Sequence, residues 1–161
     1  ALSHRGIVVT FGTEKWYCDV GFGGNGPKGI LKLDTPEIQT LYCERFRVLR
    51  EDGQYVIVYF DGDTPVRMLK FRDEAWLDAD FAVLNGYYAV HPRSPFRKKR
   101  VLYRCTPDGW IGFREHTFLS FREGHLETRE IPTEAEIRRL IQTKFGLSIP
   151  QWETDGSENL P

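Results

Sequence analysis

The sequence predicts a mainly β (α+β) fold: an antiparallel β-barrel, then a helical connector, then a small α/β lid with a C-terminal helix. Short runs of β-branched and aromatic residues fill the first two thirds of the chain, turn signals separate them, and two stretches change to helical spacing. Short strands at this spacing are typical of an antiparallel barrel or sandwich. We expect the barrel at residues 1–72, the connector at 73–92, the lid at 93–150 and an unstructured tail at 151–161.

The barrel is expected to contain five strands, at residues 6–11, 16–22, 44–51, 55–60 and 67–71. Glycine and aspartate mark the turns between them, as in Glu51-Asp-Gly-Gln. We centre the turn of the first hairpin between Thr13 and Glu14, which puts Asp19 opposite Val8.

The connector differs from the barrel because its apolar residues fall near helical spacing, so a helix is expected over residues 73–90. Four lid strands follow, at residues 100–105, 110–114, 117–122 and 125–131. The final helix begins with Thr133 as N-cap and Glu136 three residues later, a capping-box arrangement, and Gly146 fits the C′ position that ends it. Its apolar stripe is formed by Ile137, Leu140, Ile141 and Phe145.

Composition excludes several classes of partner. The 22 basic and 23 acidic residues give a net charge of -1, which argues against a nucleic-acid partner. No apolar stretch approaches the roughly 20 residues of a membrane span, and no signal-peptide pattern is present, so we expect no membrane partner and a cytoplasmic protein. Cys18, Cys43 and Cys105 lack metal-ligand spacing, and we expect reduced, buried thiols and no metal site.

His4 and Asp19 are the candidate catalytic pair. A carboxylate bonded to one imidazole nitrogen fixes the tautomer and leaves the other nitrogen free to take a proton from a nucleophile. In the expected hairpin both side chains face one side of the sheet, and we expect a hydrogen bond of about 2.6 to 3.2 Å between them. That register leaves them about four residues apart, roughly 13 Å, so a bulge, twist or fold-back must close the gap. The alternative is that His4 is a frayed terminal residue and Asp19 a turn-forming carboxylate.

Two loops are candidate ligand contacts. Residues 21–27 include four glycines, so the backbone can approach a ligand closely; the alternative is a tight barrel corner. Residues 91–96 contain two prolines, which restrict the geometry in which Ser94 and Phe96 are presented. The basic run at 97–100 either attracts an anionic group such as a phosphate or is a solvated charge run.

Six motifs occur in an order and spacing that together are specific: His4, Cys18-Asp-Val-Gly-Phe-Gly-Gly24, Asp80-Phe-Ala-Val-Leu-Asn85, His91-Pro-Arg-Ser-Pro-Phe96, Thr106-Pro-Asp-Gly109 and Lys144-Phe-Gly-Leu-Ser-Ile-Pro150. With these motifs the chain resembles the arylamine N-acetyltransferases from residue 4 to about residue 150. In that family a Cys-His-Asp triad takes an acetyl group from acetyl-CoA as a thioester and passes it to an arylamine, arylhydrazine or hydroxylamine. The resemblance implies that His4 is the base and Asp19 its orienter.

The resemblance also implies a set of binding residues. Those for the aromatic acceptor are Gly21, Phe22, Gly23 and Phe96. Tyr88 and Ser94 correspond to positions where the family meets coenzyme A, the acyl donor. We expect Phe22 and Phe96 to face one shared cavity with Ser94 at its mouth, because aromatic rings beside glycine or proline suit pocket walls.

The sequence departs from the family pattern at the nucleophile. The family's cysteine lies in an Arg-Gly-Gly-x-Cys motif on an N-terminal helical domain, and no such motif occurs here. Cys18 neighbours Asp19 on a strand and points to the opposite face. We therefore expect the chain to be the C-terminal part of such an enzyme, with a Cys-bearing helical segment as its partner. Two alternatives stay open: a non-catalytic small-ligand or CoA-binding relative that lost the nucleophile, and an unrelated small-ligand β-barrel.

Overall fold

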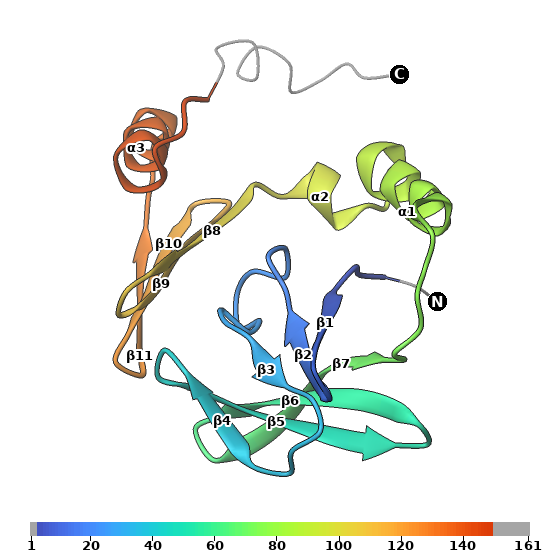
Figure 1. The fold of residues 1–161 in the computed structure, drawn as a ribbon. Helices are drawn as coiled ribbons and strands as arrows, with labels where there is room; N and C mark the ends of the chain where they lie inside the picture. Colours follow the sequence, from blue (N-terminus) through green and yellow to red (C-terminus); the bar gives the residue numbers. More distant parts are fainter. Residues whose placement is uncertain (1–2, 150–161) are drawn as a thin grey trace.

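The structure is a computed structural model that describes residues 3–149, and it is mainly β, as predicted. Three antiparallel sheets account for the strands of this range (Figure 1). The expected tail at 151–161 lies outside the described residues.

Each sheet is formed by strands that are consecutive in the chain. The first sheet contains β1 (Ile7–Phe11), β2 (Glu14–Cys18) and β3 (Leu31–Lys32). The second contains β4 (Ile38–Leu41), β5 (Glu44–Glu51), β6 (Gln54–Asp61) and β7 (Thr64–Phe71). The third contains β8 (Val101–Thr106), β9 (Gly109–Arg114), β10 (Thr117–Arg122) and β11 (His125–Glu130). The helical elements are α1 (Asp78–Val90), α2 (Pro95–Lys98), α3 (Glu134–Leu140) and the π-helical turn η1 (Ile141–Phe145).

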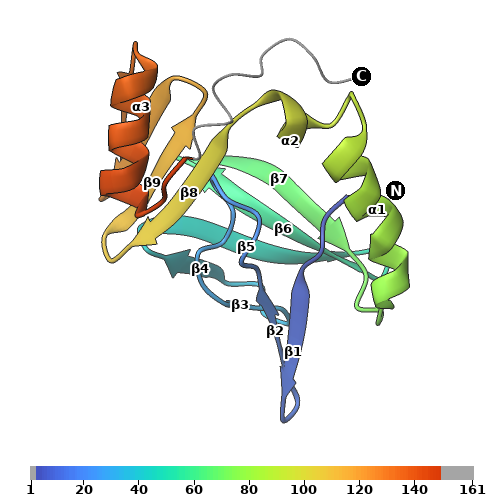
Figure 2. The same cartoon turned by 90° about the horizontal axis from the view of Figure 1, so that it is seen from above.

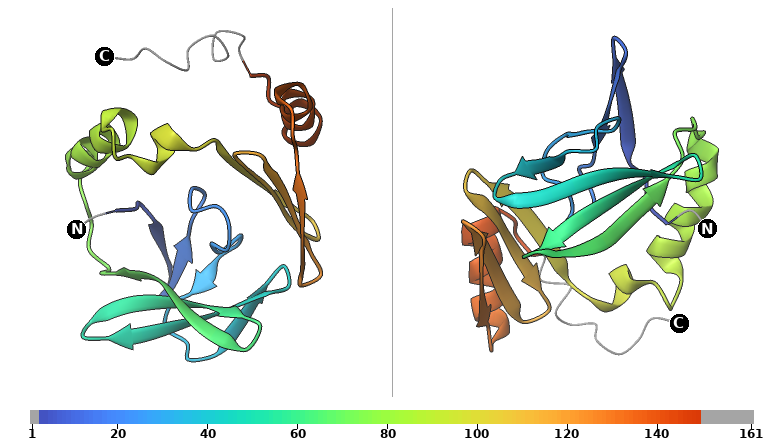
Figure 3. Two further views of the ribbon diagram at one scale, coloured as in Figure 1. Left: turned by 180° about the vertical axis from the view of Figure 1, so that it is seen from behind. Right: turned by 90° about the horizontal axis from the view of Figure 1, so that it is seen from below.

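The first two sheets lie one on the other, and the third sheet lies beside them (Figure 1). Figure 1 shows the β1–β3 sheet above the β4–β7 sheet, with the β8–β11 sheet to one side and α3 on the face of that sheet that points away from the others. Seen from above, the tip of the β1–β2 hairpin projects away from the molecule and α1 runs beside the segment that leads from Ser3 into β1 (Figure 2). The views from behind and below show α1 and α2 joining the second sheet to the third (Figure 3).

The first two sheets share a core. Along β5 the inward positions Phe46 and Val48 alternate with partly exposed ones, the two-residue period of a strand with one buried face. The buried residues of this core come from both sheets and from the segment after β3: Tyr17, Leu31, Leu33, Phe46, Val48, Tyr55, Ile57 and Tyr59. Burial of these side chains fixes the β1–β2 hairpin on the second sheet.

A second core lies between the third sheet and the final helix, and it contains Phe113, Ile131, Ile137, Leu140 and Ile141. The predicted start of α3 is confirmed, because Thr133 Oγ1 accepts the N–H of Glu136 at 3.3 Å. The predicted end is confirmed as well: Gly146 has φ +72°, the left-handed conformation that glycine adopts at little cost.

The predicted barrel does not close within the described residues, where the strands form three separate sheets. β2 and β3 pair over only two positions, and the backbone ladder stops before β4 begins. Pro36, in this interval, has no N–H with which to extend a ladder. β3 and β4 themselves were not predicted, because neither strand is long enough to show a clear alternation of apolar and polar residues.

Two further boundaries differ from the sequence prediction. The connector helix begins at Asp78 rather than at 73, because the Asp80 carboxylate accepts the N–H of Leu77 at 2.8 Å and fixes the first turn. The strand predicted over 16–22 ends at Cys18, because Asp19 bonds the backbone of the next residues. No helix within residues 3–149 is long and apolar enough to cross a membrane.

Candidate active site

The register of the first hairpin differs from the predicted one. Tyr17 pairs with Val8 and Phe11 with Glu14, so the two turn residues are Gly12 and Thr13, and Gly12 takes a positive φ of +63°. Continued past β1, this register puts Asp19 level with Gly6 instead of Val8. The offset between Asp19 and His4 along the strands therefore falls from four residues to two. The segment before β1 is not a strand, and its path brings His4 across the remaining two-residue offset.

His4 and Asp19 are in direct contact, as expected. His4 Nε2 lies 2.5 Å from Asp19 Oδ2, slightly below the expected range. The Asp19 side chain is 1% exposed, whereas the His4 side chain is 23% exposed and so remains reachable. The interpretation of His4 as a frayed terminal residue is therefore wrong.

Both carboxylate oxygens of Asp19 accept hydrogen bonds. Oδ1 accepts the backbone N–H groups of Gly21 at 2.9 Å and Phe22 at 3.0 Å, and Oδ2 accepts the phenol of Tyr17 at 2.5 Å in addition to His4. Burial raises the pKa of Asp19, but the hydrogen bonds from His4, Tyr17 and Gly21 outweigh it and leave the pKa below the ordinary value. Asp19 is therefore an ionised acceptor at neutral pH.

An ionised Asp19 determines the tautomer of His4. A carboxylate accepts hydrogen bonds and cannot donate them, so the proton of this contact lies on His4 Nε2. Nδ1 then carries the lone pair and can accept a proton. This arrangement suits a general base, in which the carboxylate orients the ring and stabilises the imidazolium that forms.

The glycine-rich loop folds back against the histidine. The Phe22 ring meets the His4 ring edge-on, with centroids 5.2 Å apart. A β-carbon on Gly26 would lie 2.6 Å from Phe22 Cδ1, and one on Gly23 would lie 2.8 Å from Tyr103 Cδ2. The glycines at these two positions are thus required by close approach of aromatic rings. Of the predicted acceptor residues, Gly21 and Phe22 contact the pair, whereas Gly23 lies against the Tyr103 ring.

The loop is anchored by an ion pair that sequence reasoning missed. Lys28 Nζ lies 2.6 Å from Glu44 Oε2, with side-chain exposures of 6% and 1%. Lys28 also lies over the Trp110 ring, 5.0 Å from its centroid, so the end of the loop contacts both the second and the third sheets. Nothing in the local sequence pairs residues 28 and 44.

Tyr88, Ser94 and Phe96 form a second group, on α1 and α2. The Tyr88 hydroxyl donates to the carbonyl of Ser3 at 2.8 Å, which brings this group beside the start of the chain. Phe96 is 67% exposed and meets Tyr88 edge-on at 5.0 Å. Ser94 is fully buried and its hydroxyl donates to the Tyr88 carbonyl at 2.7 Å, which corrects its expected place at a cavity mouth.

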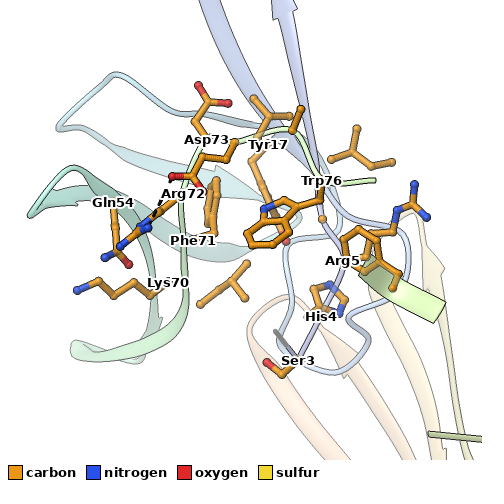
Figure 4. Close-up of a pocket in the computed structure, with 17 residues that line it drawn as sticks. Ser3, His4, Arg5, Tyr17, Gln54, Lys70, Phe71, Arg72, Asp73 and Trp76 are labelled. Carbon is orange, nitrogen blue, oxygen red and sulfur yellow. Dashed lines mark ion pairs between the residues drawn. The ribbon is translucent and has the colours of Figure 1, made fainter. Parts of the chain in front are cut away.

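A cavity of about 770 Å³ lies on the side of His4 that faces β7 and the segment before α1 (Figure 4). Its aromatic lining comes from Tyr17, Phe71, Trp76 and Phe81. Charged side chains such as Lys70, Arg72 and Asp73 lie at the other end in the close-up. Phe22 and Phe96 are not among its lining residues. Residues 69–76 form one continuous part of the lining, and the sequence assigned the last four of them to a helix.

All three cysteines are free; Cys18 is half-buried, and Cys43 and Cys105 are exposed, which corrects the expected burial. Cys43 is a turn residue between β4 and β5, and Cys105 lies on the edge strand β8. Within residues 3–149 no thiol bonds to His4, and no three His, Cys, Asp or Glu side chains gather as a metal-ligand set.

The chain is similar to proteins of one known family. A family model described as N-acetyltransferase matches residues 1–153. The arylamine N-acetyltransferase of Escherichia coli strain K12 is 29% identical over 149 residues, 91% of this chain and 53% of the relative. The chain thus spans about half the length of the curated relatives it matches.

Solved structures share the fold. The arylamine N-acetyltransferase from Salmonella typhimurium superimposes with a TM-score of 0.85 at 25% identity, covering 99% of this chain and 57% of that one. The Mycobacterium marinum enzyme, solved in complex with CoA, gives a TM-score of 0.84 at 23% identity, covering 91% of this chain and 55% of that one. From the family match and these relatives, the chain belongs to the arylamine N-acetyltransferase family.

Proposed function

We propose that this chain supplies the histidine and aspartate of a Cys-His-Asp triad that transfers an acetyl group from acetyl-CoA to an arylamine, arylhydrazine or N-hydroxyarylamine. The contact between His4 and the buried, ionised Asp19 carries the proposal. The cysteine comes from a helical partner segment outside this chain. Family membership argues against the unrelated small-ligand barrel.

The first half-reaction loads the cysteine. His4 Nδ1 takes the proton of the thiol, and the thiolate attacks the carbonyl carbon of acetyl-CoA. The bond between that carbon and the CoA sulfur breaks, and the departing CoA thiolate takes a proton from His4. The products are an acetyl-cysteine thioester and free CoA, and Asp19 stays ionised throughout.

The second half-reaction releases the acetyl group. The acceptor nitrogen attacks the thioester carbon while His4 removes a proton from the nitrogen, and the carbon–sulfur bond breaks. The cysteine leaves as a thiolate that regains its proton from His4. An N-acetylated product forms and the free thiol is restored.

We assign the acceptor to the glycine-rich loop and the acyl donor to the α1–α2 segment. Gly21 and Phe22 lie against the His4–Asp19 pair, Gly23 follows them in the same loop, and Phe96 offers an exposed ring for an aromatic acceptor. For CoA, the residues present fit a phosphate-bearing ligand. Arg93 and Arg97 are exposed residues of the α1–α2 segment, and CoA carries phosphates. The buried Ser94 hydroxyl supports the backbone at Tyr88 instead of reaching a ligand. A cytoplasmic location, where acetyl-CoA is available, completes the proposal.

The test is reconstitution. The 161-residue chain by itself is expected to give no acetyl-CoA-dependent acetylation of aniline, because it has no placed nucleophile. Addition of the Cys-bearing helical segment should start turnover, measured as release of the free CoA thiol. In that complex His4→Gln should abolish turnover, while His125→Gln, on the exposed strand β11, should not.

Two results would contradict the proposal. Robust turnover by the chain alone would mean that the nucleophile lies within it. No turnover with the helical segment present, although the segment binds and CoA binds, would favour the alternative, a non-catalytic CoA-binding relative.

A further inference from the structure

We propose that Tyr17 is a positioning residue for the acetyl-transfer reaction: its buried phenol fixes the Asp19 carboxylate in the orientation that holds His4. This inference rests on the proposed function, since it assigns a role within the same site. Neither the motifs of the sequence nor the family comparison assigns a role to Tyr17.

The phenol shares an acceptor with the histidine. Tyr17 and Asp19 are two residues apart, so their side chains lie on one face of the hairpin. The Tyr17 hydroxyl donates to Asp19 Oδ2 at 2.5 Å, and His4 Nε2 lies at the same distance from the same oxygen. Any rotation of the carboxylate that keeps one of these bonds changes the other. The position of the phenol therefore limits where the imidazole can sit.

Tyr17 itself is held rigidly by the protein core. It is 1% exposed and belongs to the core between the first two sheets. Its ring packs on Phe71 with centroids 5.1 Å apart. Gly6 also approaches the ring closely, because a β-carbon there would come within 2.5 Å of Tyr17 Cε2 and 2.7 Å of its hydroxyl oxygen. A ring confined by these neighbours can hold its hydroxyl at one point.

The other donors to Asp19 are less firmly fixed. Gly21 and Phe22 belong to a loop, and His4 lies near the start of the chain outside any strand. Tyr17 is the donor of this set that a regular strand and a packed core both constrain. Burial, and then the hydrogen bond to Asp19, raise the pKa of Tyr17, so the phenol stays neutral and remains a donor.

The chain contains a matched control for this role. Tyr55 is also 1% exposed, stacks on the same Phe71 ring with centroids 5.4 Å apart, and donates its hydroxyl to the Asp34 carboxylate at 2.8 Å. Tyr55→Phe therefore removes a phenol-to-carboxylate bond from the same core without touching the His4–Asp19 pair. A purely structural role for Tyr17 predicts the same outcome for Tyr17→Phe and Tyr55→Phe.

The first experiment uses the 161-residue chain and does not depend on activity. The side-chain carboxyl carbon of Asp19 is followed by ¹³C NMR against pH, together with the solvent exchange of the His4 Nε2 proton. Tyr17→Phe should raise the pKa of Asp19, because one donor to the charged form is lost, and should speed exchange of the His4 proton. Gly6→Ala, which displaces the ring without changing Tyr17, should do the same. Tyr55→Phe should leave both signals as in the original chain.

The second experiment uses the chain reconstituted with the Cys-bearing segment. Tyr17→Phe should lower kcat on the order of 10-fold, as loss of an outer hydrogen bond does in other sites, with the KM for aniline unchanged. Tyr55→Phe should leave kcat unchanged. Equal effects of the two variants, or an Asp19 titration that Tyr17→Phe and Gly6→Ala do not move, would overturn the inference. If His4→Gln retains full turnover, the proposed function fails instead, whatever the Asp19 titration shows.

Discussion

Lys28 and Glu44 form a buried ion pair that ties the glycine-rich loop to the start of β5. Their charged atoms lie 2.6 Å apart, and neither side chain is more than 6% exposed. Burial lowers the pKa of Lys28 and raises that of Glu44, and the mutual hydrogen bond opposes both shifts. The pair keeps the loop that carries Gly21 and Phe22 in place beside Asp19.

Removal of one partner of this pair should be strongly destabilising. Lys28→Met leaves the Glu44 charge buried without its partner, and we expect a loss of about 3 kcal/mol in the free energy of unfolding, measured by urea denaturation. The double variant Lys28→Met with Glu44→Leu should cost less than the sum of the two single changes. Asp63→Asn, which breaks an exposed pair with Arg45, is the control and should have little effect. Additive losses in the double variant would show that the two charges do not interact.

The lowered pKa of Asp19 predicts a dependence of stability on pH. A group whose pKa is lower in the folded state than in the unfolded chain stabilises the fold at pH values above its unfolded-state pKa, which is about 3.9 for aspartate. That stabilisation is lost as the pH falls through the folded-state pKa. The free energy of unfolding should therefore decrease on acidification from about pH 6 to about pH 2. Asp19→Asn should be less stable at neutral pH and should lose less over this interval. If the free energy of unfolding of Asp19→Asn changed with pH as it does in the original chain, Asp19 would not be held in its ionised form.

Gly6→Ala and Gly86→Ala should have opposite effects. At Gly6 a methyl group would overlap the Tyr17 ring, and we expect a loss of about 1–3 kcal/mol from overpacking. At Gly86, inside α1, a β-carbon meets no atom within 4 Å, so alanine should stabilise by about 0.5–1 kcal/mol through its helix propensity. Thermal unfolding of the two variants measures both. Equal melting temperatures would refute the steric argument.

Phe22 and Phe96 should affect acceptor choice more than stability. Phe22 is 37% and Phe96 67% exposed, so truncation to alanine removes little core packing. In the reconstituted enzyme, Phe22→Ala and Phe96→Ala should change the ratio of kcat/KM values among arylamines. Phe113→Ala, at a fully buried position, is the control for core loss and should cost about 3–5 kcal/mol. If Phe22→Ala and Phe96→Ala lost as much stability as Phe113→Ala and left the acceptor preference unchanged, Phe22 and Phe96 would be core residues.

The sequence by itself determined the mainly β class, most of the strands and the final helix. These features depend on local properties: the two-residue period of β5, the Thr133 cap, and the left-handed glycine at 146. The candidate pair was also within reach of sequence, because His4 and Asp19 are residue types with a defined joint chemistry in an order that resembles one family. The domain limits drawn from the sequence stay a prediction.

Tertiary structure alone decided how the site is assembled. The hairpin turn at Gly12, one position from the predicted centre, brings Asp19 level with Gly6 and lets His4 reach it. The Lys28–Glu44 pair and the cavity beside His4 each join residues that are distant in the chain, and the Tyr17 ring is packed by core residues of the second sheet. Periodicity predicts which face of a strand a side chain occupies. The register, which decides which residues of two strands lie opposite each other, depends on the turn and on the packing of whole sheets. For that reason the His4–Asp19 contact could be expected from the chemistry of the two residues, whereas the register that brings them together could not.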